Sequence, residues 1–150
     1  MKVSVIIPSL NPDEKLICVV DSLREAGFDD IILVNDGSDE NHMEPFEHVS
    51  AYPECTILTH EVNKGKGRGL KTAFEYCIKP DIDGVVTVDG DNQHKAADIL
   101  KCCEKMAECK DKVVLGVRNF SGKDVPFKSR FGNNMTSFVF KFACGLNISD

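Results

Sequence analysis

Four short runs of consecutive apolar residues, most of them β-branched, constrain the fold of this chain more than any other feature. They are centred in VSVIIP (3–8), DIILVND (30–36), TILTH (56–60) and GVVTVD (84–89). These runs lack the alternation of polar and apolar residues found in half-exposed strands, so they are typical of strands buried on both faces of a parallel sheet. KVVLGV (112–117) predicts a fifth strand of the same kind.

Helical patterns separate most of these strands. DEKLICVVDSLREAG (13–27) places apolar residues at helical spacing and stops at Gly27, and two further patterns, KGRGLKTAFEYCIK (66–79) and AADILKCCEKMAEC (96–109), flank the fourth strand. Alternating strands and helices predict a Rossmann-like α/β fold with three layers, in which helices cover a mostly parallel central sheet. A chain of 150 residues suits one domain, which buries about 70% of its unfolded surface.

The charge pattern indicates a defined anionic ligand. The net charge of −6 and the pI near 5.2 exclude a general nucleic-acid binder, which needs a basic surface. Within this acidic chain, NKGKGRGLK (63–71) carries four basic residues and no acidic one.

Cysteines and hydropathy indicate a cytoplasmic protein. The seven cysteines form no C-x-x-C pair, and we interpret them as reduced core thiols, with a disulfide framework as the alternative. The N-terminal apolar run is too short for a signal peptide, and no run has the length of a membrane span.

Polar residues gather at the ends of the predicted strands, where open parallel sheets bind their ligands. The segments are Pro8–Ser9, Asn35 to Ser38, Asn63 to Arg68, and Asp89 to Asp91. Ordinary turns and a solvated helix start are the alternative explanation. Gly65, Gly67 and Gly69 do not fit G-x-G-x-x-G, and no P-loop string exists, so neither common phosphate fingerprint is present.

Asp89 and Asp91 place two like charges at a strand end, and a divalent cation would relieve their repulsion. Mg²⁺ or Mn²⁺ suits such hard oxygen ligands, and Gln93 offers a neutral oxygen at the same spacing. An EF-hand is excluded because His94 stands at the sixth loop position, which requires glycine. Helix capping would explain one of the two aspartates but not both.

Six blocks in order give the sequence a resemblance to a known family. They are VSVIIPSLN, VNDGS, NKGKGRGLKTAF, VVTVDGDNQH, VLGVRNF and RFGNNM. Together they resemble the family 2 glycosyltransferases of the GT-A fold, in particular the branch that transfers sugars to dolichyl or polyprenyl phosphate. The resemblance covers nearly the whole chain.

The resemblance implies a role for each matching residue. It places the nucleotide against Pro8, Ser9, Asn11, Asp36, Gly37, Lys66, Gly67, Asp89 and Gly90. It makes Asp89, Asp91 and Gln93 the site of Mg²⁺ or Mn²⁺. It counts Asp89 and Asp91 as catalytic together with Arg118 and Arg130, whose side chains are expected near the donor or acceptor phosphates.

The implied function is inverting transfer of a sugar from a UDP- or GDP-linked donor to a lipid phosphate or a glycan. A lipid phosphate is already an anion and needs no general base, whereas a sugar hydroxyl needs a carboxylate base, for which the chain offers no clear candidate. Two rivals are a sugar nucleotidyltransferase, whose glycine-rich signature after the first strand is absent from PSLNPDEKL, and a non-catalytic module that binds nucleotide sugars.

The sequence departs from the family pattern in two places. Family members usually have glutamate directly after the first asparagine, whereas this chain continues Asn11-Pro12-Asp13-Glu14. Family members also continue beyond the position of Asp150, so residues 1–150 are expected to form a GT-A domain truncated on its acceptor side. The full-length protein is then expected at the cytoplasmic face of a membrane.

The stretch NNMTSFVFKFACGL (133–146) is aromatic and apolar. Its ordinary interpretation is a helix that packs on the domain. The functional alternative is an interfacial helix in peripheral contact with a membrane beside a lipid acceptor. A homodimer is a further consequence that such an apolar surface allows.

Overall fold

The structure is a computed structural model that describes residues 1–78, 81–109 and 112–116. The chain divides into two compact units, Met1–Val114 and Leu115–Asp150. All the helices and strands of the described residues lie in the first unit.

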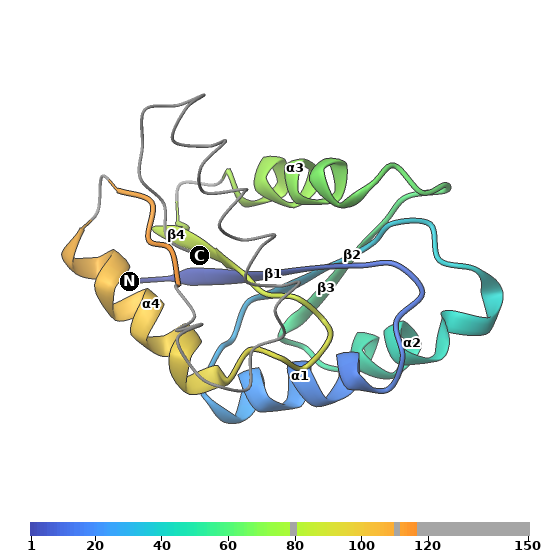
Figure 1. The fold of residues 1–150 in the computed structure, drawn as a ribbon, viewed down its shortest axis with the longest axis horizontal. Helices are drawn as coiled ribbons and strands as arrows, with labels where there is room; N and C mark the ends of the chain where they lie inside the picture. The colour runs from blue at the N-terminus through green and yellow to red at the C-terminus, as the bar shows by residue number, and fades with distance from the viewer. Residues whose placement is uncertain (79–80, 110–111, 117–150) are drawn as a thin grey trace, which may run out of the picture. The chain divides into compact units, whose positions relative to one another are not determined.

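Four parallel strands form the central sheet of the described residues (Figure 1). They are β1 (Val3–Ser9), β2 (Ile31–Asn35), β3 (Cys55–Thr59) and β4 (Gly84–Thr87), in the spatial order β3-β2-β1-β4. The predicted boundaries of these strands agree with the structure to within two residues. The parallel sheet predicted from the continuous apolar runs is therefore confirmed.

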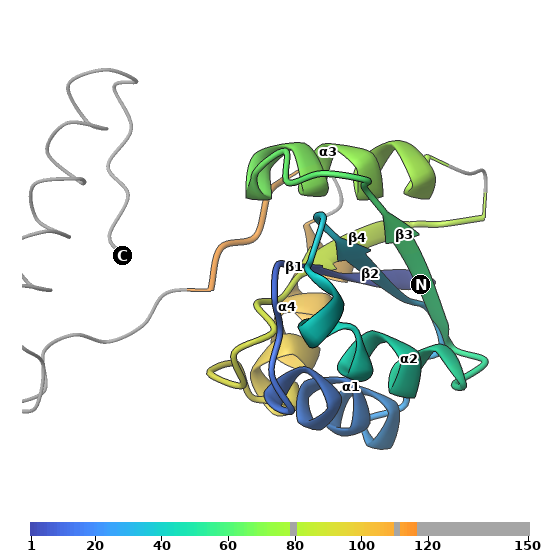
Figure 2. The same ribbon diagram turned by 90° about the vertical axis from the view of Figure 1, so that its right-hand side faces the viewer.

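Helices cover both faces of the sheet, which gives the three predicted layers (Figure 2). On one face lie α1 (Lys15–Glu25), α2 (Glu44–Ser50) and α4 (Ala96–Glu108), and on the other lies α3 (Lys66–Cys77).

Successive strand residues point to opposite layers and build two cores. Val5 packs in the core with α1, α2 and α4, whereas Ile6 packs in the core with α3. Both side chains are fully buried. This is why the strands carry continuous apolar runs instead of alternating ones.

Gly27 ends the first helix as predicted. Its φ of +89° is a left-handed conformation that favours glycine. Its amide donates to the carbonyl of Arg24, and the amide of Phe28 donates to the carbonyl of Leu23.

The strand order reverses between β1 and β4. From β1 the chain moves through α1 to β2 and through α2 to β3, and then α3 crosses the other face to place β4 beside β1. In open parallel sheets ligands bind at a switch point of this kind, which here lies at the carboxyl ends of β1 and β4.

Three elements differ from the sequence-based prediction. The prediction omitted α2 and the short 3₁₀ helix Glu40–His42 (η1) that precedes it. The predicted strand at 112–117 was wrong over residues 112–116, which form no strand. Val113 is 87% exposed, so its side chain lacks the packing that a central strand requires.

No helix among the described residues is long and apolar enough to cross a membrane. The six cysteines in this part of the chain are free thiols, as predicted. Cys77 is buried in the core, but Cys18 is exposed, so the interpretation as core thiols was wrong there. Cys144 lies outside the described residues.

Candidate nucleotide and metal site

Asp36 and His60 form a buried pair at the ends of β2 and β3. Imidazole Nδ1 lies 2.7 Å from Asp36 Oδ1, and the amide of Lys64 donates to the same oxygen at 3.0 Å. Burial alone would raise the pKa of the carboxyl. Hydrogen bonds from His60 and from the amides of Lys64 and Gly65 outweigh burial and hold the pKa of Asp36 below its ordinary value. Asp36 is therefore an anion at neutral pH.

His60 and its second partner were missed by the sequence-based prediction. The other ring nitrogen, Nε2, lies 3.0 Å from the hydroxyl of Thr72 on α3. A single histidine after an apolar strand has no local signature, and its partners are 24 and 12 positions away in the chain. The position of His60 at the end of a predicted strand, beside the end of β2, could have indicated that it belongs to the site.

Gly37 allows two loops to touch. Its φ is +75°, and a Cβ built on it would lie 2.4 Å from the backbone nitrogen of Asn63 and from the carbonyl carbon of Val62. No side chain fits there without backbone movement. Gly37 thus holds the loop after β2 against the loop after β3, which carries the basic segment.

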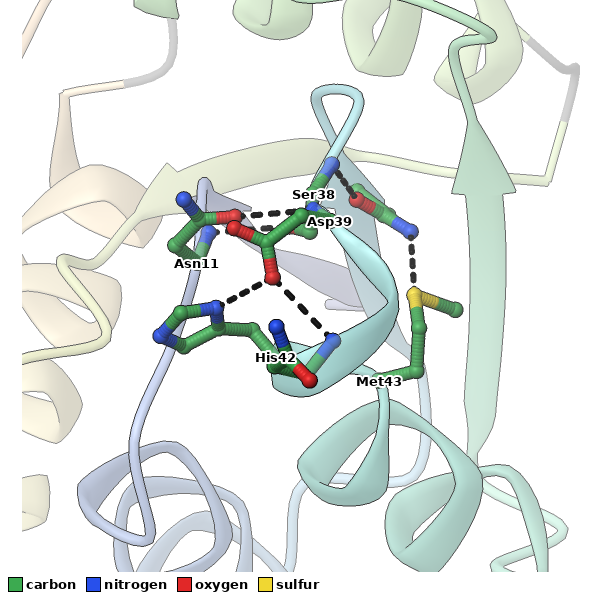
Figure 3. Close-up of polar contacts among 7 residues, drawn as sticks. Asn11, Ser38, Asp39, His42 and Met43 are labelled. Carbon is green, nitrogen blue, oxygen red and sulfur yellow. Dashed lines mark hydrogen bonds and ion pairs between the residues drawn. The ribbon is translucent and has the colours of Figure 1, made fainter.

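A polar network ties the loop after β1 to the loop after β2 (Figure 3). The Asn11 amide donates to Ser38 Oγ at 2.9 Å, and Asn11 Oδ1 accepts from the amide of Asp39 at 3.0 Å. Asp39 Oδ1 in turn lies 2.7 Å from His42 Nδ1. Asn35, which is buried, accepts from the amide of Ser38. Asn11 is therefore a loop-fixing residue whatever it binds.

The end of β1 packs closely against the loop after β4 and against α3. Ser9 Oγ is buried and has no hydrogen-bond partner among the described residues. A Cβ built on Gly90 would lie 3.1 Å from that oxygen, and one built on Gly69 would lie 3.8 Å from Pro8 Cβ. The glycines at these positions bring three backbones together around Pro8 and Ser9.

Lys66 links the basic segment to the paired aspartates. It is the first residue of α3, and its Nζ lies 2.5 Å from Asp89 Oδ1. His94 Nε2 lies 4.0 Å from the other oxygen of Asp89. Asp91 Oδ1 accepts from the amide of Gln93 at 3.0 Å, so Asp91 also stabilises its own loop.

The donor chemistry at Asp89 and Asp91 fits a magnesium-type ion. Mg²⁺ typically takes one or two protein carboxylates and completes its shell with water and substrate phosphate. The Asp89 side chain is 45% exposed, so it remains accessible. No group of three or more His, Cys, Asp or Glu suited to a metal exists among the described residues. Phosphate oxygens would have to supply part of the shell.

The remaining site residues divide into two groups. Gly67 lies in the first turn of α3 with open space at its Cα, beside the nucleotide-site candidate Lys66. Arg118, Arg130 and the aromatic stretch at 133–146 lie outside the described residues. The structure thus brings together Ser9, Asp36, Lys66 and Asp89 at one edge of the sheet.

Comparison with protein families gives one match that spans almost the whole chain. Residues 4–149 match the family described as Glycosyl transferase family 2.

Two curated relatives are similar over nearly the whole chain. A UDP-N-acetylglucosamine--dolichyl-phosphate N-acetylglucosaminyltransferase of Methanococcus voltae is 28% identical over 97% of this chain and 64% of its own length. An undecaprenyl-phosphate 4-deoxy-4-formamido-L-arabinose transferase of Pectobacterium carotovorum is 26% identical over 99% of this chain and 46% of its own length. The chain therefore spans less than two thirds of these relatives.

Two solved structures share the fold. S. aureus TarS 1-349 in complex with UDP-GlcNAc aligns with a TM-score of 0.62 at 20% identity, over 84% of this chain and 37% of its own. The mannosyltransferase PcManGT from Pyrobaculum calidifontis, in complex with GDP-Man and Mn²⁺, aligns with a TM-score of 0.60 at 18% identity, over 71% and 32%.

Proposed function

Because the chain belongs to glycosyl transferase family 2, we propose that it transfers a sugar from a nucleotide-diphosphate sugar to a polyprenyl phosphate, with inversion at the anomeric carbon. The observation that carries the proposal is that three groups lie at the carboxyl-terminal side of the sheet. They are the buried anion Asp36, the cation Lys66 and the aspartates of the β4 loop. The carboxylate of Asp36 can accept a hydrogen bond from the nucleotide base. Lys66 and the aspartates can bind the diphosphate and its metal ion.

The nucleotide is proposed to lie along the carboxyl ends of β1, β2 and β4. Asp36 accepts from the base, and Pro8, Ser9, Asn11 and Gly37 shape the adjoining surface. Lys66, Gly67, Asp89 and Gly90 flank the diphosphate. The S. aureus TarS structure holds UDP-GlcNAc and the PcManGT structure holds GDP-Man, and these two complexes support a donor of this class.

Asp89 and Asp91, with Gln93, are proposed to hold Mg²⁺ or Mn²⁺. When bound, such an ion stabilises the negative charge that grows on the nucleoside diphosphate as it leaves. The Lys66 ammonium lies beside Asp89 and can move onto a diphosphate oxygen, where it favours the same developing charge. The Mn²⁺ in the PcManGT complex supports this choice of ion.

The acceptor is proposed to be a lipid phosphate at the cytoplasmic face of a membrane. The names of both curated relatives include a dolichyl or undecaprenyl phosphate. A phosphate acceptor is an anion at neutral pH, so it needs no general base. Arg118 and Arg130 are proposed to contact the donor or acceptor phosphates.

Calorimetric titration with UDP, with and without Mn²⁺, tests the proposal. We expect Mn²⁺ to strengthen UDP binding in the wild type, and Asp91→Asn to lose that enhancement while it keeps the acceptor for the Gln93 amide. Asp98→Asn is the matched control, because Asp98 is an exposed aspartate on α4 that pairs with Lys101. Equal enhancement in Asp91→Asn would refute the metal assignment.

Two activity measurements separate the rival functions. Slow release of the sugar from labelled UDP-sugar in the presence of Mn²⁺ is expected of a transferase. A donor that stays bound and intact would favour a binding module. Exchange of pyrophosphate into a nucleoside triphosphate would favour a nucleotidyltransferase.

A further inference from the structure

Two donors converge on one oxygen of the Asp36 carboxylate. They are His60 Nδ1 at 2.7 Å and the amide nitrogen of Lys64 at 3.0 Å, and both contact Oδ1. A carboxylate oxygen has two lone pairs in the carboxylate plane, so these donors use the ordinary capacity of Oδ1. Neither donates to Oδ2. The Gly65 amide, which also favours the charged form of Asp36, donates at 2.8 Å to Asn63 Oδ1. Oδ2 therefore keeps acceptor capacity for a ligand.

The position of the Asp36 carboxylate is fixed by His60, which is itself held by Thr72 on α3. An ionised carboxylate only accepts, so His60 Nδ1 must carry a proton. The Thr72 hydroxyl holds the opposite side of the ring at 3.0 Å from Nε2, and in a neutral ring it donates to that nitrogen. The His60 and Asp36 side chains are only 7% and 5% exposed. Packing therefore prevents Asp36 from turning Oδ1 toward a ligand.

We propose that His60 is a positioning residue that selects the base of the donor: it occupies Asp36 Oδ1 and leaves one acceptor oxygen, which suits uracil better than guanine. The inference rests on the proposed function, in which Asp36 binds the base. It makes a uridine diphosphate sugar the substrate class.

Uracil and guanine differ in how many acceptors they require. Uracil presents one ring donor, N3–H, which a single oxygen satisfies. Guanine presents N1–H and N2–H side by side and pairs best with both oxygens of one carboxylate. With Oδ1 occupied, one guanine donor would be left unpaired in a buried site, which weakens binding by about tenfold or more.

Two substitutions of His60 separate selection from packing. Asparagine can place its amide nitrogen near the position of imidazole Nδ1 and keep the donor to Oδ1. Glutamine can place its amide near the position of Nε2, which keeps the contact to Thr72 but withdraws the donor from Oδ1. Calorimetric titration of the chain with UDP and with GDP, both with Mn²⁺, gives the ratio of the two affinities for each variant.

We expect wild type and His60→Asn to bind UDP at least about tenfold more tightly than GDP. In His60→Gln the ratio is expected to fall by about tenfold, because guanine gains a second acceptor. A purely structural role would weaken both nucleotides alike and leave the ratio unchanged. Thr72→Val, which keeps the shape of residue 72 but removes its hydroxyl, is a second variant if His60→Gln does not fold. In Thr72→Val we expect the ratio of UDP to GDP affinity to fall by a smaller factor. The ¹⁵N chemical shifts of the His60 ring are expected to show a mixture of the two tautomers.

The possible outcomes distinguish this inference from the proposed function. A wild type that binds neither nucleotide would overturn both. A wild type that binds UDP and GDP equally, or a ratio that His60→Gln and Thr72→Val leave unchanged, would overturn the role of His60 alone.

Discussion

The hydroxyl of Ser9 is a polar group that the fold buries without a partner among the described residues. Such a group destabilises a protein, because its hydrogen bond to water is lost on folding. Ser9→Ala is therefore expected to raise the free energy of unfolding by about 1 kcal/mol. If Ser9 contacts the nucleotide as proposed, the same change weakens UDP binding. Urea denaturation and calorimetry check the two effects, and a loss of stability would contradict the first.

Asp36 makes stability depend on pH in a defined direction. Its pKa is lowered in the folded chain, because the hydrogen bonds from His60 and the Lys64 amide outweigh the effect of burial. A carboxyl with a lowered pKa contributes stability above its unfolded pKa and loses it as the pH falls through the folded one. The unfolded value is about 3.9, so the loss is expected below about pH 4.

Comparison with Asp36→Asn isolates this contribution. The difference in free energy of unfolding between wild type and Asp36→Asn, from urea denaturation, is expected to shrink as the pH falls from about 5 toward 3. Asp29→Asn makes the same change of charge at an exposed loop residue and controls for general charge effects. A difference that grows between about pH 5 and pH 3 would contradict the assignment.

The sequence predicts the place of a candidate-site residue when a charged side chain follows a strand that the sequence also predicts. A predicted strand precedes each of Asp36, Lys66 and Asp89. Because these strands are parallel, the residues that follow them lie at the same side of the sheet. His60 also ends a strand, but its role depends on Asp36 and on Thr72. Those contacts arise from strand order and from the rotation of α3, which a local pattern does not contain.

At the scale of elements, Gly37 and Gly27 form a matched pair. Both have a positive φ, but a Cβ on Gly37 would meet backbone atoms at 2.4 Å, whereas a Cβ on Gly27 would meet open space. Gly27→Ala is expected to cost only the left-handed penalty of about 1–2 kcal/mol.

Gly37→Ala adds a steric clash with the loop after β3. We expect it to cost clearly more than Gly27→Ala, by at least about 1–3 kcal/mol, because two backbones must separate. The displaced loop leads into Lys66 at the start of α3, so UDP affinity is expected to fall in Gly37→Ala but not in Gly27→Ala. Equal losses of stability in the two variants, measured by urea denaturation, would show that the loop after β3 moves away from residue 37 at little cost in free energy.

The errors over α2 and over residues 112–117 share a cause. The helix α2 has only seven residues, too few to be stable by propensity alone, and it is stabilised by burial of Phe46 and Val49 in the core. Residues 112–117 have the opposite properties, since they are rich in β-branched residues but Val113 is exposed. Tertiary packing decided both cases against local propensity.

At the scale of the molecule, the order of the strands determines where the site lies. Strand and helix alternation in the sequence was enough to predict a three-layer parallel fold, and the likeness to S. aureus TarS supports the GT-A type. The sequence did not predict that β4 lies beside β1. That neighbour relation places the Asp89 loop against Ser9 and creates the switch point.

A ligand that bridges this switch point is expected to stabilise the whole chain. UDP with Mn²⁺, at about 100 times its Kd, should raise the free energy of unfolding by about 2.7 kcal/mol, because it binds only the folded state. This rise in the free energy of unfolding tests ligand binding at the site without any measurement of enzyme turnover.

Lys66→Met should lower this ligand-dependent gain but barely change the stability of the ligand-free chain. Lys66 and Asp89 are 61% and 45% exposed, and exposed ion pairs contribute little to stability. Loss of the ammonium instead removes a partner of the diphosphate, so the affinity falls and the gain at a fixed UDP concentration falls with it. Lys71→Met is the control, because Lys71 lies on the same helix and pairs only loosely, at 3.9 Å, with Glu75. Urea denaturation with and without ligand measures both effects. If both lysine variants kept the full gain, Lys66 would not face the diphosphate.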